Sequence, residues 1–572
     1  MTKGNIQGTH KRNIKGSGVL SSTMAGLTAT AMLIGVLGAS ASASASTKES
    51  SGKPLSLTVS GNTVEPIPHS FNPYILTSGG NLIDAEPMIY ESLLQFDLLK
   101  PGTIYNWLAS SYQLTNGDKT LTFNIRKGVK WTDGTPFTSA DVVFSFDLMK
   151  KYPSLNSNGD TFTSVRAEGP YKVVFSFAKA NYPQLYDIGS TYIVPESLWK
   201  NVNPTKFLDT NPVGTGPYTV ERFSPEDLVL TKYPNYWQRG KPQVTELNYP
   251  AWSSADADNR DLSNGTETWA GNYIPDVKKT YIAADPKYRH YWFAPVGVVA
   301  LLPNLTVYPL NKLAVRKAIS DAIDRQTVSV EGESTYEAPA TSPTGLVLPY
   351  DNSVLAPQYK NVRFKQDDAQ AKKLLEGAGF KMGSGGYFLG KNGKPITLTI
   401  MDPSSYSDYM TDAQIISSNL KAIGIKVNVE GLSVNAWTAD YTDGDFQLTI
   451  LYSNIGPSPY YWYNGWLNDS LTAPVGKAAT ADFSRWYSAS TQKALAEYTA
   501  GTTVAARNAG IMAIEKVMVE DEPVIPLVYS AVWFEYDNRN VVGWPTPSNP
   551  YAMGEPAGAN AEVTVLHLRP RK

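Results

Sequence analysis

The sequence of 572 residues contains no cysteine, only four histidines and few charged side chains. Without cysteine there is no disulfide, no thiolate nucleophile, no cysteine-ligated zinc and no iron–sulfur cluster. Four scattered histidines leave little for a metal site or for serine–histidine catalysis, so we expect neither a metal nor a cofactor. Charged residues make up 18% of the chain, against about 25% in typical soluble proteins. The net charge of −2 argues against a nucleic-acid partner, which needs a basic surface.

Aromatic residues, in contrast, are abundant: 34 Tyr, 13 Trp and 18 Phe. A mean hydropathy of −0.26 and a hydrophobic fraction of 42% are typical of a soluble globular protein. The length corresponds to about three or four domain-sized units, which can bury a large core without disulfides. An excess of aromatic over charged side chains indicates a surface that binds neutral ligands.

Residues 1–45 are typical of a secretory signal peptide. A basic region up to Lys15 precedes a charge-free, mostly apolar run over residues 19–37, and residues 39–45 repeat the small-x-small pattern of a cleavage site. We therefore expect export, with a mature chain that starts near Ser46. A retained membrane anchor is the alternative, but the run is short and diluted by Gly, Ala and Thr. The exported protein would sit in the periplasm or at the extracellular face of the membrane, and it cannot be lipidated through cysteine.

The mature chain alternates between strand and helix patterns. Apolar residues occur at every second position of residues 121–125, which predicts a strand with one face on a core. Lys127-Gly128 then predicts a turn. Thr138 and Asp141 resemble a capping box, in which a short acid replaces the usual Glu, and apolar residues at helical spacing follow.

The same patterns recur in the second half of the chain. Residues 315–323 and 371–378 have apolar residues at the spacing of a helix stripe. Residues 395–400 predict a strand, 412–423 a helix and 425–429 the next strand. Strands joined through a helix favour a parallel pair with a right-handed crossover, so the fold class is α/β.

One long segment resembles a known family. Residues 126–146, RKGVKWTDGTPFTSADVVFSF, resemble the signature of the family 5 extracytoplasmic solute-binding proteins, the dipeptide/oligopeptide-binding family of ABC importers. Segments within residues 211–237, 315–325 and 371–379 resemble the same family in the same order. Together they cover most of residues 55–542. Glycines and apolar positions dominate these motifs, so they identify the scaffold rather than the ligand.

The resemblance implies a two-lobed α/β fold of the type II periplasmic-binding-protein kind, with an additional domain and hinged lobes that close on a ligand. By analogy, residues 46–92, 189–310 and 530–572 form lobe 1 (domain I), 93–188 an extra domain (domain II), and 311–529 lobe 2 (domain III). It also implies a monomer that captures a small molecule outside the membrane and delivers it to ABC permease subunits. Such a protein is not an enzyme and needs no catalytic residue.

The ligand class depends on one segment. In peptide-binding members an Asp in the loop after a strand of lobe 2 pairs with the α-ammonium group of the ligand. The corresponding residues 446–468 contain no acid, and burial of an ammonium group without a partner costs several kcal/mol. The segment resembles the cello-oligosaccharide-binding branch of the family. We therefore favour a neutral oligosaccharide over an oligopeptide, which stays as the alternative.

The candidate ligand-binding residues are aromatic or neutral polar side chains, five of them in a stretch broken by Gly and Pro that we expect to be a loop. They are Tyr460, Tyr461, Trp462, Tyr463 and Trp466, with Asn454 before them and Trp252, Trp269, Asn272 and Trp292 elsewhere. Aromatic faces can stack on pyranose rings while polar groups bond to the hydroxyls. Each aromatic residue can equally belong to the core. If Trp462 is a contact residue, Trp462→Ala should weaken binding and leave stability nearly unchanged.

An exported glycoside hydrolase is the alternative from another functional class. It would also combine a signal peptide with many aromatic residues, but it needs two carboxylates that face each other across the substrate. The family signature argues against this alternative, and sequence alone does not exclude a suitable pair among 52 acids.

Overall fold

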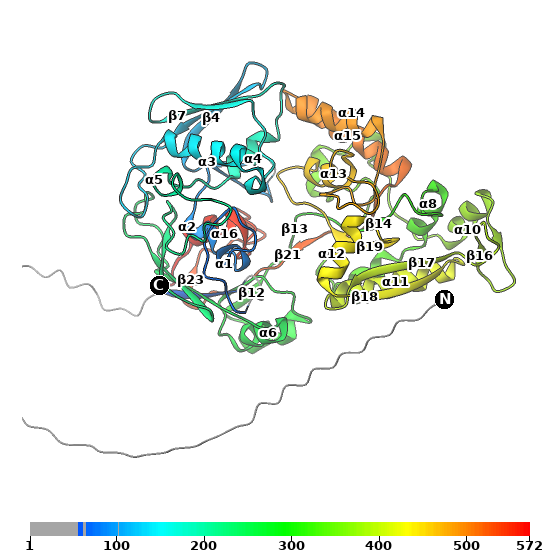
Figure 1. Ribbon diagram of the computed structural model, residues 1–572. Helices are drawn as coiled ribbons and strands as arrows, with labels where there is room; N and C mark the ends of the chain where they lie inside the picture. The colour runs from blue at the N-terminus through cyan, green and yellow to red at the C-terminus, as the bar shows by residue number, and fades with distance from the viewer. Residues whose placement is uncertain (1–54, 61–64, 101) are drawn as a thin grey trace, which may run out of the picture. The chain divides into compact units, whose positions relative to one another are not determined.

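The computed structural model describes residues 55–60, 65–100 and 102–572, which belong to one compact unit (Figure 1). The predicted signal peptide at residues 1–45 lies outside the described residues. Within the described ranges, no helix has the length and apolar character to span a membrane. The architecture is mixed α/β, as predicted, and it contains three main sheets.

The first lobe is built on a seven-stranded mixed sheet. In sheet order its strands are β12 (Arg289–Tyr291), β22 (Glu535–Asp537), β11 (Trp269–Ala270), β1 (Ser56–Ser60), β10 (Glu246–Pro250), β9 (Asp227–Lys232) and β8 (Tyr218–Ser224). Strand β1 is parallel to both of its neighbours, and the remaining pairs are antiparallel. Because β22 comes from the C-terminal part of the chain, the first lobe is assembled from segments far apart in the sequence.

The second lobe has a five-stranded sheet whose parallel part was predicted correctly. In sheet order the strands are β18 (Lys426–Leu432), β17 (Thr397–Pro403), β19 (Leu448–Tyr452), β14 (Val299–Pro303) and β20 (Ile525–Val528). The parallel strands β17 and β18 are joined through helix α11 (Ser407–Ala422), which begins five residues before the predicted start at Asp412. Helices α8 (Leu313–Ala322) and α10 (Asp368–Gly377) confirm the two predicted helical stripes.

A four-stranded antiparallel sheet carries the signature segment. In sheet order it contains β4 (Ala109–Thr115), β5 (Thr120–Ile125), β7 (Lys172–Ser176) and β6 (Ser164–Ala167). The capping box of α3 (Ser139–Lys151) is present: the Thr138 backbone N–H donates to the Asp141 carboxylate at 2.9 Å. Phe146 of α3 packs edge-on against Phe175 of β7, with ring centroids 4.8 Å apart. The signature therefore forms a strand–turn–helix unit around a buried aromatic core.

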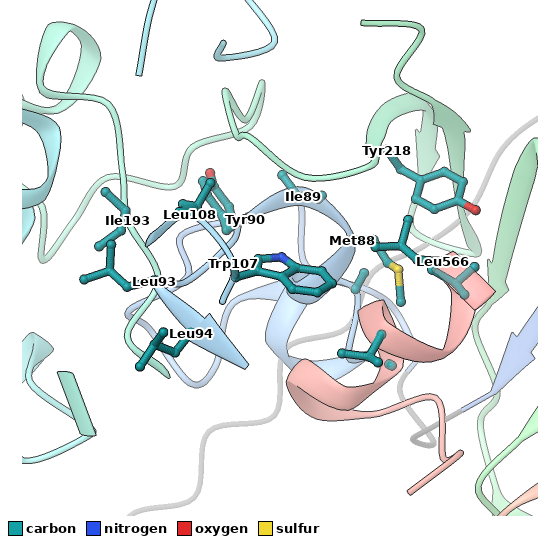
Figure 2. Packing of buried hydrophobic residues seen from close by; sticks show 14 of the residues in the cluster. Met88, Ile89, Tyr90, Leu93, Leu94, Trp107, Leu108, Ile193, Tyr218 and Leu566 are labelled. Atoms are coloured by element: carbon teal, nitrogen blue, oxygen red, sulfur yellow. The ribbon is translucent and has the colours of Figure 1, made fainter. Parts of the chain in front are cut away.

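The C-terminal helix α16 (Gly558–His567) completes the core of the first lobe. Figure 2 shows its residue Leu566 beside Met88 of the short helix α2 (Glu86–Ile89), in a cluster of buried hydrophobic side chains. Trp107 lies in the same cluster.

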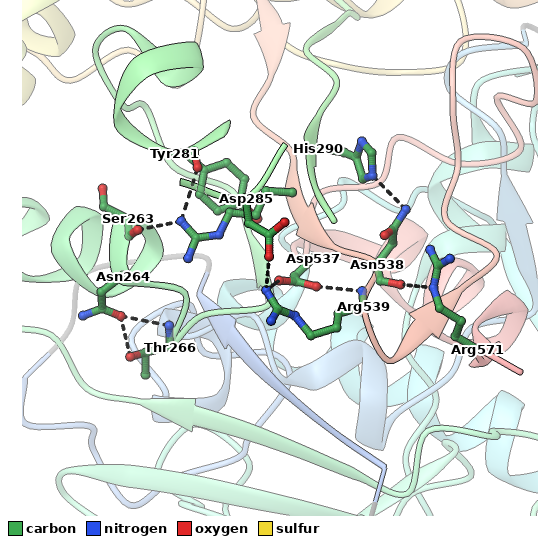
Figure 3. Close-up of polar contacts among 11 residues, drawn as sticks. Ser263, Asn264, Thr266, Tyr281, Asp285, His290, Asp537, Asn538, Arg539 and Arg571 are labelled. Atoms are coloured by element: carbon green, nitrogen blue, oxygen red, sulfur yellow. Dashed lines mark hydrogen bonds and ion pairs between the residues drawn. The ribbon is translucent and has the colours of Figure 1, made fainter. Parts of the chain in front are cut away.

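Polar contacts hold the returning chain to the outer edge of the same lobe (Figure 3). Arg539, just after β22, donates to Asp285 at 2.5 Å, and the Arg571 guanidinium donates to the backbone carbonyl of Asn538 at 2.7 Å. The C-terminal segment is thus a structural part of the first lobe.

The two lobes are connected where the chain crosses twice. Strand β13 (Ala294–Pro295) lies between β12 and β14, and β21 (Ala531–Val532) lies between β20 and β22. These strands pair antiparallel, with Ala294 opposite Val532 and Pro295 opposite Ala531. A two-stranded ribbon therefore links the sheets of the two lobes, while the precise domain boundaries given above stay predictions.

Buried carboxyl groups without a cationic partner occur in both lobes. The three groups are Glu91 with Glu562, Asp258 with Glu267 and Glu535, and Glu333 with Glu337 and Asp412. None of the ion pairs in residues 55–60, 65–100 and 102–572 involves them. Burial, reinforced by the neighbouring carboxylate, raises the pKa of Glu267 well above its ordinary value. These acids therefore favour the protonated form in the folded protein.

The free energy of unfolding should consequently fall as the pH rises. Glu267 in the unfolded chain loses its proton near its ordinary pKa of about 4.3, whereas Glu267 in the folded protein keeps its proton to higher pH. Between the pKa values of the unfolded and folded states, the folded state therefore binds more protons. Glu267→Gln mimics the protonated acid and should be more stable than the wild type at pH 8. The difference should be at least about 1.4 kcal/mol, the free energy that corresponds to a change of one in the pKa. At pH 4 the two proteins should differ little.

Urea unfolding at pH 4, 6 and 8 measures this difference. Glu226→Gln, at an exposed position, is the matched control and should follow the wild type at each pH. If the stability of Glu267→Gln followed that of the wild type at a constant difference across this range, the assignment of a protonated, buried Glu267 would be contradicted.

Candidate functional site

Two adjoining cavities lie between elements of the two lobes and share Asp351, Pro457 and Ser458. The elements around them are β2 (Leu94–Phe96), β3 (Ile104–Asn106), α4 (Gln184–Ser190), η4 (Tyr350–Ser353), α13 (Tyr460–Leu467), α14 (Ala489–Ala500) and α15 (Val504–Asp521). The smaller cavity has a volume of about 30 Å³ and the larger of about 270 Å³. The linking strand β13 contributes Pro295 to the smaller cavity, so this cavity begins at the connection between the lobes.

The lining of the smaller cavity combines apolar side chains with one exposed aromatic residue. Leu98, Leu99 and Val296 form much of its apolar wall. Tyr350 in its lining is 57% exposed, whereas Trp462 is only 3% exposed. The Trp462 indole N–H donates to the Gly345 carbonyl at 3.0 Å, so Trp462 is a packed wall of the cavity.

Aromatic rings from opposite sides of the larger cavity form part of its lining. These are Phe96, Tyr182, Tyr186, Tyr461 and Tyr498. Tyr461 of α13 reaches across to α4, where its ring lies 5.0 Å from that of Tyr186 and its hydroxyl donates to the Pro183 carbonyl at 3.4 Å. On the same side, the Tyr182 N–H donates to the Thr499 carbonyl at 2.9 Å. The segment around α4 and the second lobe therefore touch at the cavity rim, in addition to the pairing of the linking strands.

The predicted aromatic loop is a helix, and this prediction was wrong. Tyr460, Tyr463 and Leu467 are spaced three and four residues apart, the period of a helix face, and α13 buries this stripe in the core of the second lobe. Trp462 and Trp466 are buried in the same core. The expectation that Trp462→Ala leaves stability unchanged is therefore wrong as well. Of the five aromatic residues, Trp462 and Tyr461 line the cavities.

The other predicted contact residues line neither cavity. Asn454 is exposed after β19, and Trp292 is half-buried in the first lobe. Trp252, Trp269 and Asn272 are buried in the first lobe, where the Trp269 indole N–H donates to the Gly554 carbonyl at 2.7 Å and the Trp252 indole N–H donates to Asp261 at 3.1 Å. A ligand contact for these five residues stays a prediction.

Sequence reasoning missed Asp351, the one carboxylate among the described residues that line the two cavities. Asp351 lies about one hundred residues before the acid-free segment, and its Oδ2 accepts a hydrogen bond from the Val347 N–H at 2.8 Å. Burial raises the pKa of Asp351 to about 7. Tyr350 and Arg507 were also missed. No local motif marks these residues, because only the folded chain brings η4, α13 and α15 to one place.

Residues 103–473 match the family model described as bacterial extracellular solute-binding proteins, family 5 middle. The nickel-binding periplasmic protein of Escherichia coli is 26% identical over 66% of this chain and 71% of its own length. The oligopeptide-binding protein AppA of Bacillus subtilis is 26% identical over 72% of this chain and 75% of its own.

Solved structures show the same fold over nearly the whole chain. A periplasmic oligopeptide-binding protein of an ABC transporter from Thermotoga maritima, solved with mannohexaose bound, superposes with a TM-score of 0.76 at 24% identity. The alignment covers 91% of this chain and 99% of that one.

Substitutions of two residues in the smaller cavity distinguish a core side chain from a ligand-contact side chain. Trp462→Ala removes a buried side chain and its hydrogen bond, and it should cost about 3–5 kcal/mol of stability. Tyr350→Ala, at an exposed position, should change stability by no more than about 0.5 kcal/mol while it weakens ligand binding. Chemical denaturation and ligand titration of both proteins test this pair. A Trp462→Ala protein as stable as the wild type would contradict the assignment of Trp462 to the core. A Tyr350→Ala protein with unchanged affinity for the ligand would contradict the assignment of Tyr350 as a contact residue.

Proposed function

Because the chain belongs to the family 5 bacterial extracellular solute-binding proteins, the substrate-binding components of ABC importers, we propose that it captures a neutral oligosaccharide outside the cytoplasmic membrane. The loaded protein would act as an exported monomer and deliver this ligand to the membrane permease of its importer. Closure of the lobes on the ligand supplies the difference between loaded and empty states.

The observation that carries the proposal is the shortage of free charge in the cavity walls. Among the described lining residues, Asp351 and Arg507 are the only Asp, Glu, Lys or Arg. Asp351 already accepts the Val347 N–H. Arg507 donates to the Gly501 carbonyl at 2.9 Å, and its guanidinium stacks over the Tyr182 ring at 3.6 Å. A charged ligand would meet few side chains of opposite charge that are free to pair with it in these cavities, and desolvation of an unpaired charge is costly.

The aromatic walls support the sugar interpretation. Tyr350 is exposed, and Tyr186 and Tyr461 form an aromatic pair in the larger cavity. Ser458 and Tyr498 hydroxyls, 2.7 Å apart, add neutral polar groups. This combination suits pyranose rings, whose C–H faces stack while their hydroxyls bond at the edges. The mannohexaose bound by the Thermotoga maritima protein supports the idea that this fold accommodates a linear sugar chain.

An oligopeptide is the second candidate. The Bacillus subtilis relative is named for oligopeptide binding, and Asp351 could supply the carboxylate that residues 446–468 lack. An α-ammonium group bonded to the free Asp351 oxygen would lower the raised pKa of this acid.

A glycoside hydrolase fits less well. Retaining and inverting hydrolases both need two carboxylates across the scissile bond, and the described walls of the two cavities supply one, Asp351. We therefore propose stoichiometric binding without turnover.

Calorimetry with Asp351→Asn separates the two ligand classes. Asn keeps an oxygen that can accept the Val347 N–H, so the fold should persist. Binding of β-linked oligosaccharides should change at most about threefold, whereas loss of a charge-assisted bond should weaken peptide binding by about tenfold or more.

The wild-type protein should respond to the oligosaccharides and not to peptides of two to six residues. Peptide binding without any sugar response would overturn the oligosaccharide proposal, and a tenfold loss of that peptide binding in Asp351→Asn would establish the second candidate. Release of shorter sugars during the titration would instead favour a hydrolase.

A further inference from the structure

A third cavity, with a volume of about 240 Å³, lies apart from the two described above and shares no residue with them. Its walls come from the segment around α1 (Gly79–Leu82), from the end of α3 with the turn after it, and from the end of α4. The lining residues are Pro73, Tyr74, Leu76, Asn81, Met149, Leu155, Ser157, Asn158, Asp160, Ser190, Thr191 and Tyr192. Residues before and within α4 also line the larger cavity between the lobes, so this helix contributes to both.

Asp160 is the unusual group in this cavity. Its side chain is 5% exposed, and the Thr191 hydroxyl donates to its Oδ2 at 2.9 Å. Its Oδ1 is buried and has no hydrogen-bond partner among the described residues. An acceptor that is buried and unpaired costs free energy that a bound donor would recover.

The donors around Asp160 are already used within the protein. The Asn158 amide donates to Thr191 at 2.8 Å, the Ser190 hydroxyl donates to the Tyr186 carbonyl at 2.8 Å, and the Tyr74 hydroxyl donates to the Tyr192 carbonyl at 2.8 Å. The cavity therefore has a free acceptor but few free donors. A ligand that fits it must bring hydrogen-bond donors.

The ionisable groups near this cavity are acids and tyrosines. Asp187 of α4 lies close enough for the charge of Asp160 to raise its pKa further, beyond the larger effect of burial. Tyr74 and Tyr192 are the other titratable groups in the walls, and burial raises the pKa of both, so they stay neutral. No Lys or Arg occurs among the described lining residues. When Asp160 is ionised, the site thus favours a cation over a neutral donor.

Apolar side chains complete the walls. Leu76 at the rim is 70% exposed, and Met149 and Leu155 are buried. An exposed leucine beside a buried carboxylate forms an amphipathic site, with one polar end and one apolar side.

From this arrangement we propose that the third cavity binds a small protonated primary amine, whose ammonium group donates to Asp160 Oδ1 while its carbon chain packs against Leu76, Met149 and Leu155. This site is separate from the proposed oligosaccharide site and does not depend on it. Three N–H donors and a positive charge match the free acceptor and the charge of the ionised Asp160 carboxylate.

Binding should depend on pH through Asp160. Burial raises the pKa of Asp160 to about 7, with the Thr191 hydrogen bond acting in the opposite direction. The amine needs the carboxylate form, so a proton and the amine compete for Asp160. Affinity should rise between pH 5 and pH 8 by about tenfold or more and should level off above the pKa.

Titration of the full-length protein with n-butylammonium chloride tests the proposal, read by calorimetry and by the shift in Tm. We expect saturable binding and a higher Tm at pH 8. n-Butanol lacks the charge, tetramethylammonium lacks N–H donors, and potassium chloride supplies only a metal cation, so each should bind at least tenfold more weakly. Equal responses to butylammonium and any of these three, or no saturable binding at pH 8, would overturn the proposal.

Variants then locate the site. Asp160→Asn should weaken butylammonium binding at least tenfold and remove its pH dependence, whereas Asp147→Asn, exposed on α3, should bind like the wild type. If Asp160→Asn fails to fold, Leu76→Lys serves instead, because an extra positive charge at the exposed rim should weaken binding without disturbing the core. Unchanged affinity in a folded Asp160→Asn protein, or in Leu76→Lys, would contradict the assignment.

Discussion

The pairing of β13 with β21 is the connection on which the rest of the structure depends. Both strands lie between the seven-stranded and five-stranded sheets, and their pairing brings the outgoing and returning chains together. Pro295 of β13 and the adjacent Val296 also line the smaller cavity. A short ribbon resists rotation less than a broad packed interface does, so this geometry suits a hinge. The smaller cavity begins at this ribbon.

The aromatic surplus of the chain serves two purposes in the structure. Most of the α13 rings are core: Tyr463 donates its hydroxyl to the Thr344 carbonyl at 2.6 Å and is fully buried. Other aromatic residues line the cavities, such as Tyr461 of α13 and Tyr350 of η4. The same helix therefore stabilises the second lobe and supplies part of the wall that faces the first. Substitutions in α13 will combine both effects unless stability is measured separately.

Local patterns predicted those elements whose signals are local. The capping box at Thr138 and Asp141, the alternation in residues 121–125 and the parallel strands around α11 all depend on neighbours in the sequence. The aromatic stretch at residues 460–466 was misjudged because Pro and Gly nearby were weighed above its helical spacing. Asp351 could not be found at all, since its position beside Pro457 results from long-range folding.

The buried acids show the same limit. Composition showed few charges, but it could not show that Glu91, Glu267 and Asp412 lie in the interior with no cation paired to them. Such acids are stable only when protonated or when a ligand supplies the missing positive charge. Asp351 and Asp160 differ from them because each lines a cavity.

A crystal structure grown from an equimolar mixture of β-linked oligosaccharides and short peptides tests the central claim most directly. We expect sugar rings between the two lobes, stacked on Tyr350 and beside Tyr461, with no charged group of the ligand in contact with the protein. A peptide in the same cavities, with its α-ammonium group bonded to Asp351, would contradict it.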